Sequence, residues 1–448
     1  MSFPRYPTYK PSGVEWLGEV PEHWQEKPLK TITSINDEVL PESLSRDYEI
    51  EYVDIGSVSL ANGIEKTEAM LFGDAPSRAR RIPRDGDVLV STVRTYLKAI
   101  APVVNPPSNL VASTGFAVVR PRHELEPGFL KYALQEEHFI QQVISRSTGV
   151  SYPAINASDV AKISLNLPGS SEQLAIATFL DHETAKIDAL IAEQQRLIEL
   201  LQEKRQAVIS HAVTKGLNPD VPMKDSGVEW LGEVPEHWEI RPIKHLARVG
   251  NGSTPNRDNS DYWADHDGFP WLNSSVVNQA EVSEADRFVT NLALRDCHLP
   301  IIEPPAVLVG ITGQGRTRGM AAKLIFKATV SQHIAYIKPD LDQLAVDFLL
   351  CALGAAYERL RLDSEGSGST KGAITCEQLG LMRMPVPGPL EQVEIVSFLQ
   401  LEVASNEALK AQSELAIRLL QERRSALISA AVTGQIDVRG LVPEAVAA

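Results

Sequence analysis

Apolar residues recur at helical spacing over two long stretches of the chain. In residues 171–215 they form one wide stripe that continues for several turns, which is typical of an amphipathic helix. Ser171 is placed to cap its start, and Gly216 and Pro219 are placed to end it. A second helix of the same kind is predicted over residues 389–434. The stripes consist of Ile187, Leu190, Ile191, Leu197, Ile198, Leu201, Val208 and Ile209, and of Leu409, Ile417, Leu420, Leu427 and Ile428.

Helices of this length need a partner for the apolar stripe, and each copy offers one to the other. We expect them to pack as an antiparallel coiled coil. At 1.5 Å per residue, about 40 residues extend over roughly 60 Å, enough to hold two globular domains apart. A core helix in one compact domain is the alternative. Gln194, Lys204 and Arg205 interrupt the stripe as residues of a half-exposed seam would, which favours the coiled coil.

The segments outside the long helices mix short strand-like runs with shorter helices. Each segment therefore predicts a compact α+β domain of about 150 residues. The predicted elements are strands at 51–58, 87–92 and 115–121 with a helix at 127–145, and strands at 269–277, 306–312 and 333–339 with a helix at 341–361.

The sequence also repeats itself. Residues 12–24 and 226–238 both read SGVEWLGEVPEHW, identical at all thirteen positions. Residues 200–214 and 419–433 are identical at 11 of 15 positions. The middles, 25–147 and 239–366, align only in faint outline. One explanation is a plain tandem duplication in which the sequences of the middle segments diverged. The other is that the ends make the same contact twice, while the middles make two different contacts.

Composition narrows the class of protein. Hydrophobic residues make up 43% of the chain, enough for packed cores. Cys297, Cys351 and Cys376 are widely spaced and form no CxxC pair, which disfavours a zinc site or a disulfide framework and favours a reducing cytoplasm. No secretory segment and no run of 18 apolar residues is present, so no membrane span is expected. The net charge of −15 counts against a lone nucleic-acid binder but does not exclude DNA binding, which depends on where the cations lie.

Two groups of cations are candidates for binding phosphate or guanine, because guanidinium groups bind both through paired hydrogen bonds. Two small polar stretches, 147–155 and 366–374, also have side chains suited to phosphate. Solvated arginines and plain turns are the alternatives. The candidates are Arg78, Arg80, Arg81, Arg94, Lys98, Ser151 and Tyr152 in the first half, and Arg316, Arg318, Lys323 and Lys371 in the second.

Apparent catalytic motifs do not carry the chemistry they suggest. Residues 105–108 resemble the Asn-Pro-Pro-aromatic motif of amino-methyltransferases, but Ser108 cannot stack on a flipped base. Lys371 precedes Gly372 rather than Ser or Thr, so residues 366–372 are no P-loop. His23 and His237 are copies of one another and are expected to hydrogen-bond within a structural motif. We predict no catalytic residue, no cofactor and no metal site. A stand-alone adenine methyltransferase and a coiled-coil scaffold without a DNA role are the rival hypotheses.

The doubled segments resemble a known family. The repeated SGVEWLGEVPEHW with residues 238–255, and the stretches 149–180 and 369–399, are similar to specificity subunits of type I restriction–modification systems. The resemblance covers nearly the whole chain, in the order recognition domain, helix, recognition domain, helix. It implies target-recognition domains at 1–170 and 218–388, spacer helices at 171–217 and 389–436, and a tail at 437–448.

The resemblance also implies a role and partners. Such a subunit is non-catalytic, recognises an asymmetric bipartite target in double-stranded DNA, and docks two methyltransferase subunits and, in the full complex, restriction subunits. Two similar ends in one chain can offer two equivalent docking surfaces to copies of one partner. Trp24 and Trp238 are expected to pack each domain onto its helix instead. The docking candidates are Trp16, Trp230, Leu197, Leu201, Arg205, Leu420 and Arg424.

Overall fold

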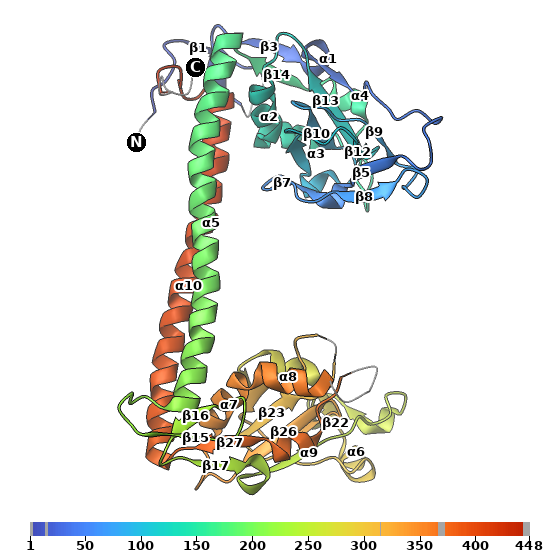
Figure 1. Ribbon diagram of the computed structural model, residues 1–448. Helices are drawn as coiled ribbons and strands as arrows, with labels where there is room; N and C mark the ends of the chain where they lie inside the picture. The colour runs from blue at the N-terminus through green and yellow to red at the C-terminus, as the bar shows by residue number, and fades with distance from the viewer. Residues whose placement is uncertain (1–2, 14–16, 314, 366–371, 442–448) are drawn as a thin grey trace. The chain divides into compact units, whose positions relative to one another are not determined.

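The computed structural model describes residues 3–13, 17–313, 315–365 and 372–441 (Figure 1). Contacts group the chain into two units. Unit 1 comprises residues 1–195 and 414–448, and unit 2 comprises residues 196–413. Each unit therefore contains one α+β segment, the beginning of one long helix and the end of the other.

The two long helices are α5 (Ser170–Lys215) and α10 (Pro389–Val432), which confirms both predicted helices to within two residues. Ser171 lies inside the first turn of α5 rather than at its cap, because the carbonyl of Gly169 already accepts hydrogen bonds from the backbone N–H groups of residues 172 and 173. Beyond the helix ends, Gly216 and Gly434 have φ values of 75° and 74°, the left-handed conformation that terminates a helix most easily at glycine.

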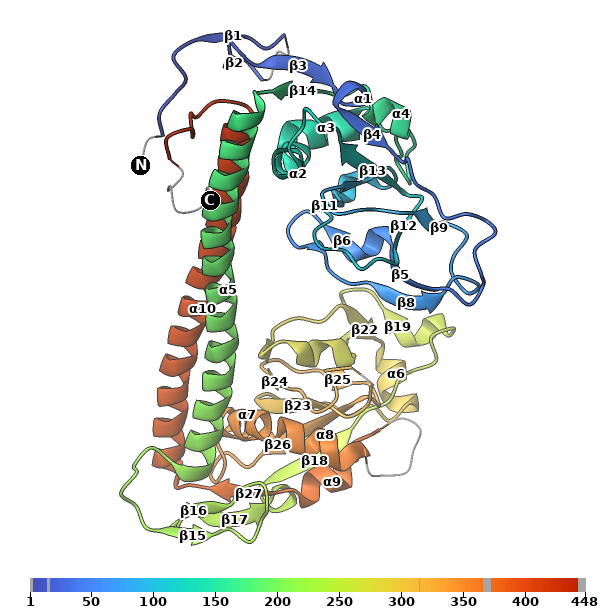
Figure 2. The same ribbon diagram turned by 45° about the horizontal axis from the view of Figure 1, so that its top comes forward.

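The helices run antiparallel in each unit. Asp188 of α5 pairs with Arg424 of α10 in unit 1, with nitrogen and oxygen 2.9 Å apart. Arg205 pairs with Glu407 in unit 2 at 2.8 Å. Seventeen residues separate 188 from 205, and seventeen separate 407 from 424, so the register is the same in both pairs. Figures 1 and 2 both show α5 beside α10. Residues 188 and 407, and residues 205 and 424, differ by the same 219 positions, so the two ion pairs are copies related by the repeat.

The seam between the helices is narrower than the predicted stripe. Leu190 and Leu197 are 52% and 40% exposed, which corrects the expectation that all apolar residues of the stripe face the partner helix. A coiled-coil seam uses about two residues in seven, so the flanking apolar residues stay in solvent. The seam positions of α10 recur every seventh residue and are all buried except the half-buried Leu420, and two of them are polar: Leu399, Asn406, Ser413, Leu420 and Leu427.

The described part of unit 1 contains two four-stranded sheets, ordered β11-β10-β13-β4 and β8-β5-β12-β9, and smaller strand pairs. All these pairings are antiparallel except the parallel pair β5–β12. The helices α2 and α3 and the end of α10 cover the first sheet, and Trp24, Phe129 and Ile428 lie in the shared core. The elements are β1 (Tyr9–Pro11), β2 (Glu19–Pro21), β3 (Gln25–Pro28), α1 (Leu29–Ile32), β4 (Thr33–Ile35), β5 (Glu49–Val53), β6 (Val58–Ser59), β7 (Gly63–Ile64), β8 (Glu68–Leu71), β9 (Ala79–Arg81), β10 (Val88–Ser91), β11 (Ile100–Pro102), β12 (Leu110–Ser113), β13 (Phe116–Pro121), α2 (Pro127–Gln135), α3 (Glu137–Ser145), α4 (Ala157–Val160) and β14 (Ser164–Leu167).

Unit 2 repeats the first sheet with one more strand, in the order β18-β26-β23-β24-β21, and has its own second sheet, β19-β22-β20-β25. Its main core contains Trp238, Phe348 and Leu399. The elements are β15 (Met223–Asp225), β16 (Glu233–Pro235), β17 (Glu239–Pro242), β18 (Ala247–Asn251), β19 (Trp263–Ala264), β20 (Phe269–Leu272), β21 (Glu281–Val282), β22 (Arg287–Val289), α6 (Asn291–Asp296), β23 (Ala306–Gly310), β24 (Ala321–Leu324), β25 (Thr329–Val330), β26 (Ile334–Pro339), α7 (Val346–Ala355), α8 (Tyr357–Glu365), α9 (Cys376–Leu381) and β27 (Arg383–Val386).

Several predicted elements are shorter than expected. The predicted helix 127–145 is two helices, because the side chain of Glu136 accepts hydrogen bonds from the backbone of residues 138 and 139 and caps α3. The predicted helix 341–361 begins at Val346 and is interrupted at Ala356. The predicted strands 51–58 and 269–277 stop early, because Asp54 and Asn273 hydrogen-bond the following backbone and start 3₁₀ turns.

The identical repeats build the same joint in both units. Trp24 is fully buried and its indole N–H donates to Glu172 at 3.0 Å, while Trp238 donates to Glu391 at 2.9 Å. His23 and His237 contact the same two carboxylates at 2.8 and 3.0 Å, which confirms their structural role. Each tryptophan thus ties its domain to the first turn of its long helix, as predicted.

The residue after each glutamate completes the joint. The amide of Gln173 donates to the carbonyls of Pro168 and Glu124 and accepts from the backbone of Glu126. Gln392 makes the equivalent three hydrogen bonds in unit 2. Since both amides are nearly fully buried, the domain and its helix are fixed to each other by satisfied polar groups.

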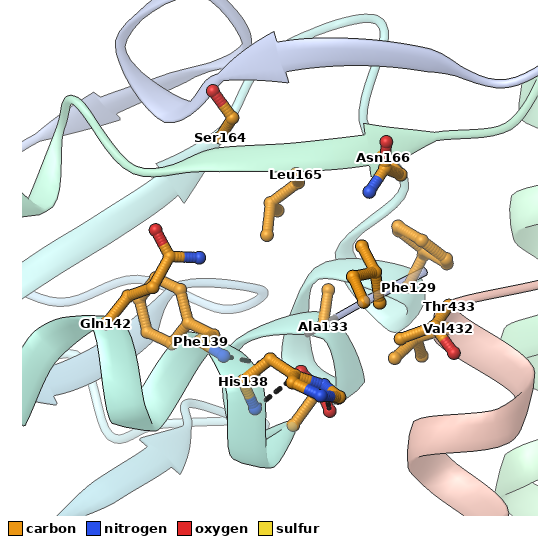
Figure 3. Close-up of a pocket in the computed structure, with 12 residues that line it drawn as sticks. Phe129, Ala133, His138, Phe139, Gln142, Ser164, Leu165, Asn166, Val432 and Thr433 are labelled. Atoms are coloured by element: carbon orange, nitrogen blue, oxygen red, sulfur yellow. Dashed lines mark hydrogen bonds and ion pairs between the residues drawn. The ribbon is translucent and has the colours of Figure 1, made fainter. Parts of the chain in front are cut away.

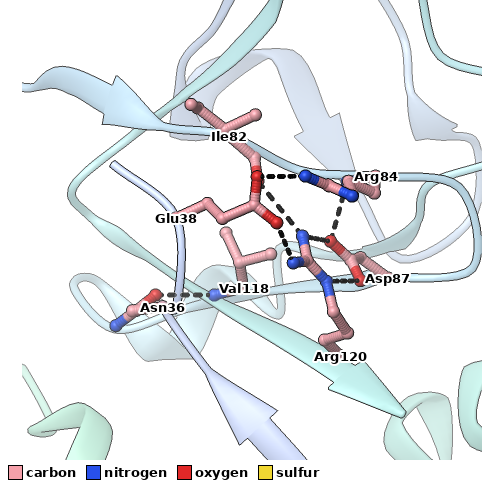
Figure 4. Close-up of polar contacts among 7 residues, drawn as sticks. All are labelled: Asn36, Glu38, Ile82, Arg84, Asp87, Val118 and Arg120. Carbon is pink, nitrogen blue, oxygen red and sulfur yellow. Dashed lines mark hydrogen bonds and ion pairs between the residues drawn. The ribbon is translucent and has the colours of Figure 1, made fainter. Parts of the chain in front are cut away.

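A network of charges holds the β4, β10 and β13 strands of unit 1 together (Figure 4). Arg120 donates to both oxygens of Asp87 at 2.9 and 2.8 Å and also binds Glu38, to which Arg84 donates at 2.7 Å. Burial alone would raise the pKa of Glu38, but hydrogen bonds from Arg84 and Arg120 outweigh it and keep that pKa below its ordinary value. The network therefore fixes the segment that leads from β9 into β10.

Over the described ranges, no helix is both long enough and apolar enough to cross a membrane.

Candidate nucleic-acid interface

The first candidate surface is a turn that follows β10 in unit 1. Thr95–Leu97 form a single 3₁₀ turn, flanked by Arg94 at φ 50° and Lys98 at φ 51°. Both flanking residues are in the left-handed region, which costs an L residue about 1 kcal/mol or more. Tyr96 and Leu97 at the tip are 53% and 48% exposed. Strained backbone of this kind is concentrated at binding sites.

A second loop, residues 147–153, holds the turn in place. The backbone N–H of Arg94 donates to the carbonyl of Pro153, and the hydroxyls of Thr95 and Ser147 are 2.8 Å apart. The Arg94 guanidinium lies 4.9 Å from the centre of the Tyr152 ring. The structure thus brings together four predicted residues, Arg94, Lys98, Ser151 and Tyr152, on two adjoining loops.

The remaining cations of the first group are less available. Arg78 is 55% exposed, but its guanidinium binds Asp54 at 2.8 Å and the hydroxyl of Tyr52 at 3.1 Å. The backbone carbonyl of Arg78 accepts a hydrogen bond from the backbone N–H of Thr114. The segment that contains Arg78 therefore lies beside the loop between β12 and β13. Lys98 binds both carboxylate oxygens of Glu137, at 2.9 and 3.0 Å.

Arg80 and Arg81 run along β9. Arg80 lies over the ring of Phe72, at 5.1 Å, and Arg81 pairs with Ala112 of β12. Desolvation lowers the pKa of Arg81. These two arginines are half-buried in the second sheet, whereas Arg94 is exposed and its guanidinium lies over the Tyr152 ring.

The equivalent surface of unit 2 is the glycine-rich loop after β23. Thr312 forms a bridge with Ala373, as Val93 does with Ala154 in unit 1. Gly313 therefore occupies the position of Arg94, and its φ of 124° again lies in the region that favours glycine. Arg316 is exposed at the tip of this loop.

Two residues of α8, which sequence reasoning missed, brace this loop. The hydroxyl of Tyr357 donates to the carbonyl of Arg316, and Arg361 donates to the carbonyl of Gly315, both at 2.8 Å. They lie more than 40 positions away in the chain, and no local pattern relates them to the loop.

The other cations of the second group have structural contacts. Arg318 is 4% exposed and lies against Gly372, where a Cβ atom would come within 1.9 Å of its Nη1, so its burial argues against contact with DNA. Lys323 pairs with Asp347 of α7 at 2.8 Å. Lys371 lies outside the described residues.

The docking candidates also divide. Leu201 is 8% exposed, which argues against a docking role, and Leu420 is half-buried. Arg205 and Arg424 form the cross-helix ion pairs described above. Leu197 is exposed, and Trp230 is half-exposed on an open cavity of about 380 Å³ that also involves Leu360 and Met382. Trp16 lies outside the described residues.

A small cavity in unit 1 belongs to the fold. It encloses about 50 Å³ between α2, α3, β14 and the end of α10, which is room for water rather than for a ligand (Figure 3). Its wall includes Glu136, whose carboxylate accepts from Ser429 of α10 at 2.9 Å. The cavity therefore marks the joint between the α2–α3 corner and the helix.

The architecture defines a class of protein: two α+β domains on a shared helical frame, with repeated joints and unlike exposed loops. A model of the type I restriction modification DNA specificity domain matches the chain twice, at residues 21–201 and 235–417. The chain belongs to this family and carries two copies of its domain, and its role is that of a DNA specificity subunit.

Relatives match along nearly their whole length. A putative type I restriction enzyme MjaX specificity subunit from Methanocaldococcus jannaschii is 24% identical, over 85% of this chain and 87% of the relative. The MjaIX specificity subunit of the same organism is 22% identical, over 95% and 96%.

Solved structures show the same fold. A chain from a study of complex assembly and conformational transition of the type I restriction–modification system matches with a TM-score of 0.72 and 22% identity, over 93% of this chain and 99% of that chain. The HsdS subunit from Thermoanaerobacter tengcongensis matches with a TM-score of 0.53 and 23% identity, over 93% and 98%.

Proposed function

We propose that the chain recognises an asymmetric, bipartite DNA target, with one half-site read by each unit. The observation that carries this proposal is the contrast within the repeat. The joints at Trp24 and Trp238 are built from identical contacts, whereas the loops at Arg94 and Gly313 share a backbone position but no side-chain chemistry. A protein that needed one symmetric site would have no use for two different loops on one frame.

We propose further that the long helices dock two methyltransferase subunits, and restriction subunits in the full complex. Copies of one partner require copies of one surface. Leu190 and its repeat equivalent Leu409 are 52% and 45% exposed, and Leu200 and its equivalent Leu419 are 48% and 54% exposed. Each unit therefore presents one leucine of each kind: 190 and 419 in unit 1, and 200 and 409 in unit 2. These four support docking better than Leu197, whose equivalent is Ala416.

In this proposal the chain supplies the address, and its partners supply the S-adenosylmethionine, ATP and nuclease chemistry in the cytoplasm. The rival methyltransferase hypothesis rests on residues 105–108. There Asn105 has φ 45° and its backbone donates to Asp85, as expected for a turn. Isothermal calorimetry of the purified chain with S-adenosylmethionine decides this point: binding would favour the rival, and no heat of binding would remove it.

The central test is the methylation pattern of the assembly. The chain is combined with its cognate methyltransferase subunit, and methylated positions are mapped on genomic DNA. We expect one bipartite sequence. Replacing residues 25–147 by the corresponding segment of another family member should change one half-site and leave the other intact. Methylation without sequence preference, or a change in both half-sites, would contradict the proposal.

The docking surface is tested by stoichiometry. The double variant Leu200→Ser, Leu409→Ser alters unit 2 alone, and we expect light scattering to show one bound methyltransferase subunit in place of two. Leu197→Ser is the matched control, because it removes an exposed leucine that the repeat does not copy. Two subunits bound to the double variant would show that docking lies elsewhere.

A further inference from the structure

The turn after β10 exposes apolar side chains where a DNA-binding surface usually has polar ones. Tyr96 and Leu97 are about half exposed, and on the adjoining loop Val150 is fully exposed and Tyr152 is 65% exposed. Large apolar side chains gathered on two neighbouring loops of a soluble protein mark a contact surface. In the described part of the equivalent unit 2 surface, residues 312–313, 315–319 and 372–375, no large apolar side chain is exposed to this degree.

The turn that carries Tyr96 and Leu97 is held in place by the residues around it. Thr95 is 3% exposed and anchors the turn through Ser147, whose hydroxyl also donates to the carbonyl of Val143 in α3. The left-handed residues on either side leave the 3₁₀ turn little freedom. Side chains held in this way can contact a surface without a large loss of conformational entropy on binding.

Each of the two cations that flank the tip contacts a neighbouring side chain. The ammonium group of Lys98 donates hydrogen bonds to both carboxylate oxygens of Glu137, so the positive charge of Lys98 is already paired with a carboxylate. The Arg94 guanidinium lies over the ring of Tyr152 on the adjoining loop. The tip itself therefore offers carbon atoms and the Tyr96 hydroxyl.

DNA has one group in the major groove that matches such a tip. The edges of the bases are donors and acceptors, except for the C5-methyl group of thymine, which packs against apolar side chains. We propose that Leu97, with Tyr96 beside it, contacts a thymine methyl group in the half-site read by unit 1. This proposal rests on the proposed function, since it assigns a base contact to one of the two recognition surfaces.

The test uses the full chain in complex with its methyltransferase subunit, and duplexes carrying the mapped target. The half-site of unit 1 is the one that changes when residues 25–147 are exchanged. Each thymine in it is replaced in turn by deoxyuridine, which removes only the methyl group. We expect one position at which wild-type affinity falls about fourfold, the value for withdrawing one methyl-sized group from an apolar contact.

The variant Leu97→Ala should weaken binding to the thymine duplex by a similar factor and lose its sensitivity to deoxyuridine at that position. Leu71→Ala is the control, because Leu71 is an exposed leucine of unit 1 on another sheet. It should keep both the affinity and the sensitivity.

Two results would overturn the inference while leaving the proposed function intact: a unit 1 half-site without a thymine, or deoxyuridine sensitivity that persists unchanged in Leu97→Ala. Equal binding of target and scrambled duplexes would instead contradict the proposed function itself. The two failures are therefore distinguishable.

Discussion

The loops at Arg94 and Gly313 occupy one position in two copies of the same framework, and they solve the same backbone problem differently. Each follows an inner strand of its sheet, each is bridged to the small polar stretch, and each has a positive φ. Unit 2 meets the requirement with glycine. Unit 1 places an arginine there and surrounds it with Tyr96, Leu97 and Tyr152. The side chains of this loop can therefore differ while the joints that hold the domain to its helix are built from the same residues.

The two units also differ in the contacts of an equivalent cation in their main sheets. Arg120 in unit 1 binds Asp87 and Glu38, whereas the equivalent Lys338 of unit 2 donates to the carbonyls of Pro304 and Pro305, each at 3.1 Å. One position thus stabilises its domain through an ion network in one unit and through neutral acceptors in the other.

The largest effects on stability are expected at the two tryptophan joints. Trp24→Ala should destabilise unit 1 by about 3–5 kcal/mol, the usual effect of removing a buried tryptophan. Trp238→Ala should cost less, because its partner Glu391 is 28% exposed and can be hydrated, while the side chain of Glu172 is only 7% exposed. Urea denaturation followed by hydrogen exchange in peptides of each unit measures both.

Trp24→Phe and Trp238→Phe are the controls, since they keep most of the ring and remove the N–H donor. A larger loss for Trp238→Ala than for Trp24→Ala would show that the glutamate's environment does not set the difference.

The next largest difference in stability is expected between variants of Arg120 and Lys338. Arg120→Ala leaves Asp87, which is 1% exposed, buried without its cation, and should cost about 3–5 kcal/mol. Lys338→Ala removes two hydrogen bonds to carbonyls and should cost about 1–2 kcal/mol. Denaturation midpoints test the ranking. Adding Asp87→Ala to Arg120→Ala should recover part of the loss, and a purely additive result would argue against an ion network.

The loop position itself is expected to show a smaller effect on stability. Gly313→Ala should cost about 1–2 kcal/mol, because an L residue resists this backbone conformation. Arg94→Gly should change stability by no more than about 0.5 kcal/mol, since relief of strain offsets the entropy of glycine. It should nevertheless weaken DNA binding, measured by fluorescence anisotropy of the assembled complex. Full affinity in Arg94→Gly would remove Arg94 from the interface.

The smallest expected difference between the two units is the pH dependence of their stability. The lowered pKa of Glu38 means that the folded state favours the carboxylate, so its contribution is complete above the ordinary value of 4.5 and is lost as pH falls through the lower, folded value. Glu38→Gln should therefore be less stable than wild type at pH 7, and the gap should close below pH 4.5. Lys338 donates to backbone carbonyls, which do not titrate, so Lys338→Ala should show no such closing.

Much of the frame could be predicted because its signals are local or repeated. The spacing of Ile187 and Leu201 follows directly from helical geometry, and the thirteen identical residues around Trp24 and Trp238 require the same joint twice. The breaks at Glu136 and Asp54 escaped prediction, because each depends on whether a side chain bonds to its own backbone instead of continuing the element.

The repeated segments and the helical spacing of apolar residues are enough to indicate the doubled architecture, the two long helices and the family. Which cations are available depends on the folded chain, because their partners come from distant parts of it: Asp54 for Arg78, Glu137 for Lys98 and Gly372 for Arg318. A periodic pattern reports how one segment meets solvent, whereas the freedom of a charge depends on what the fold places beside it.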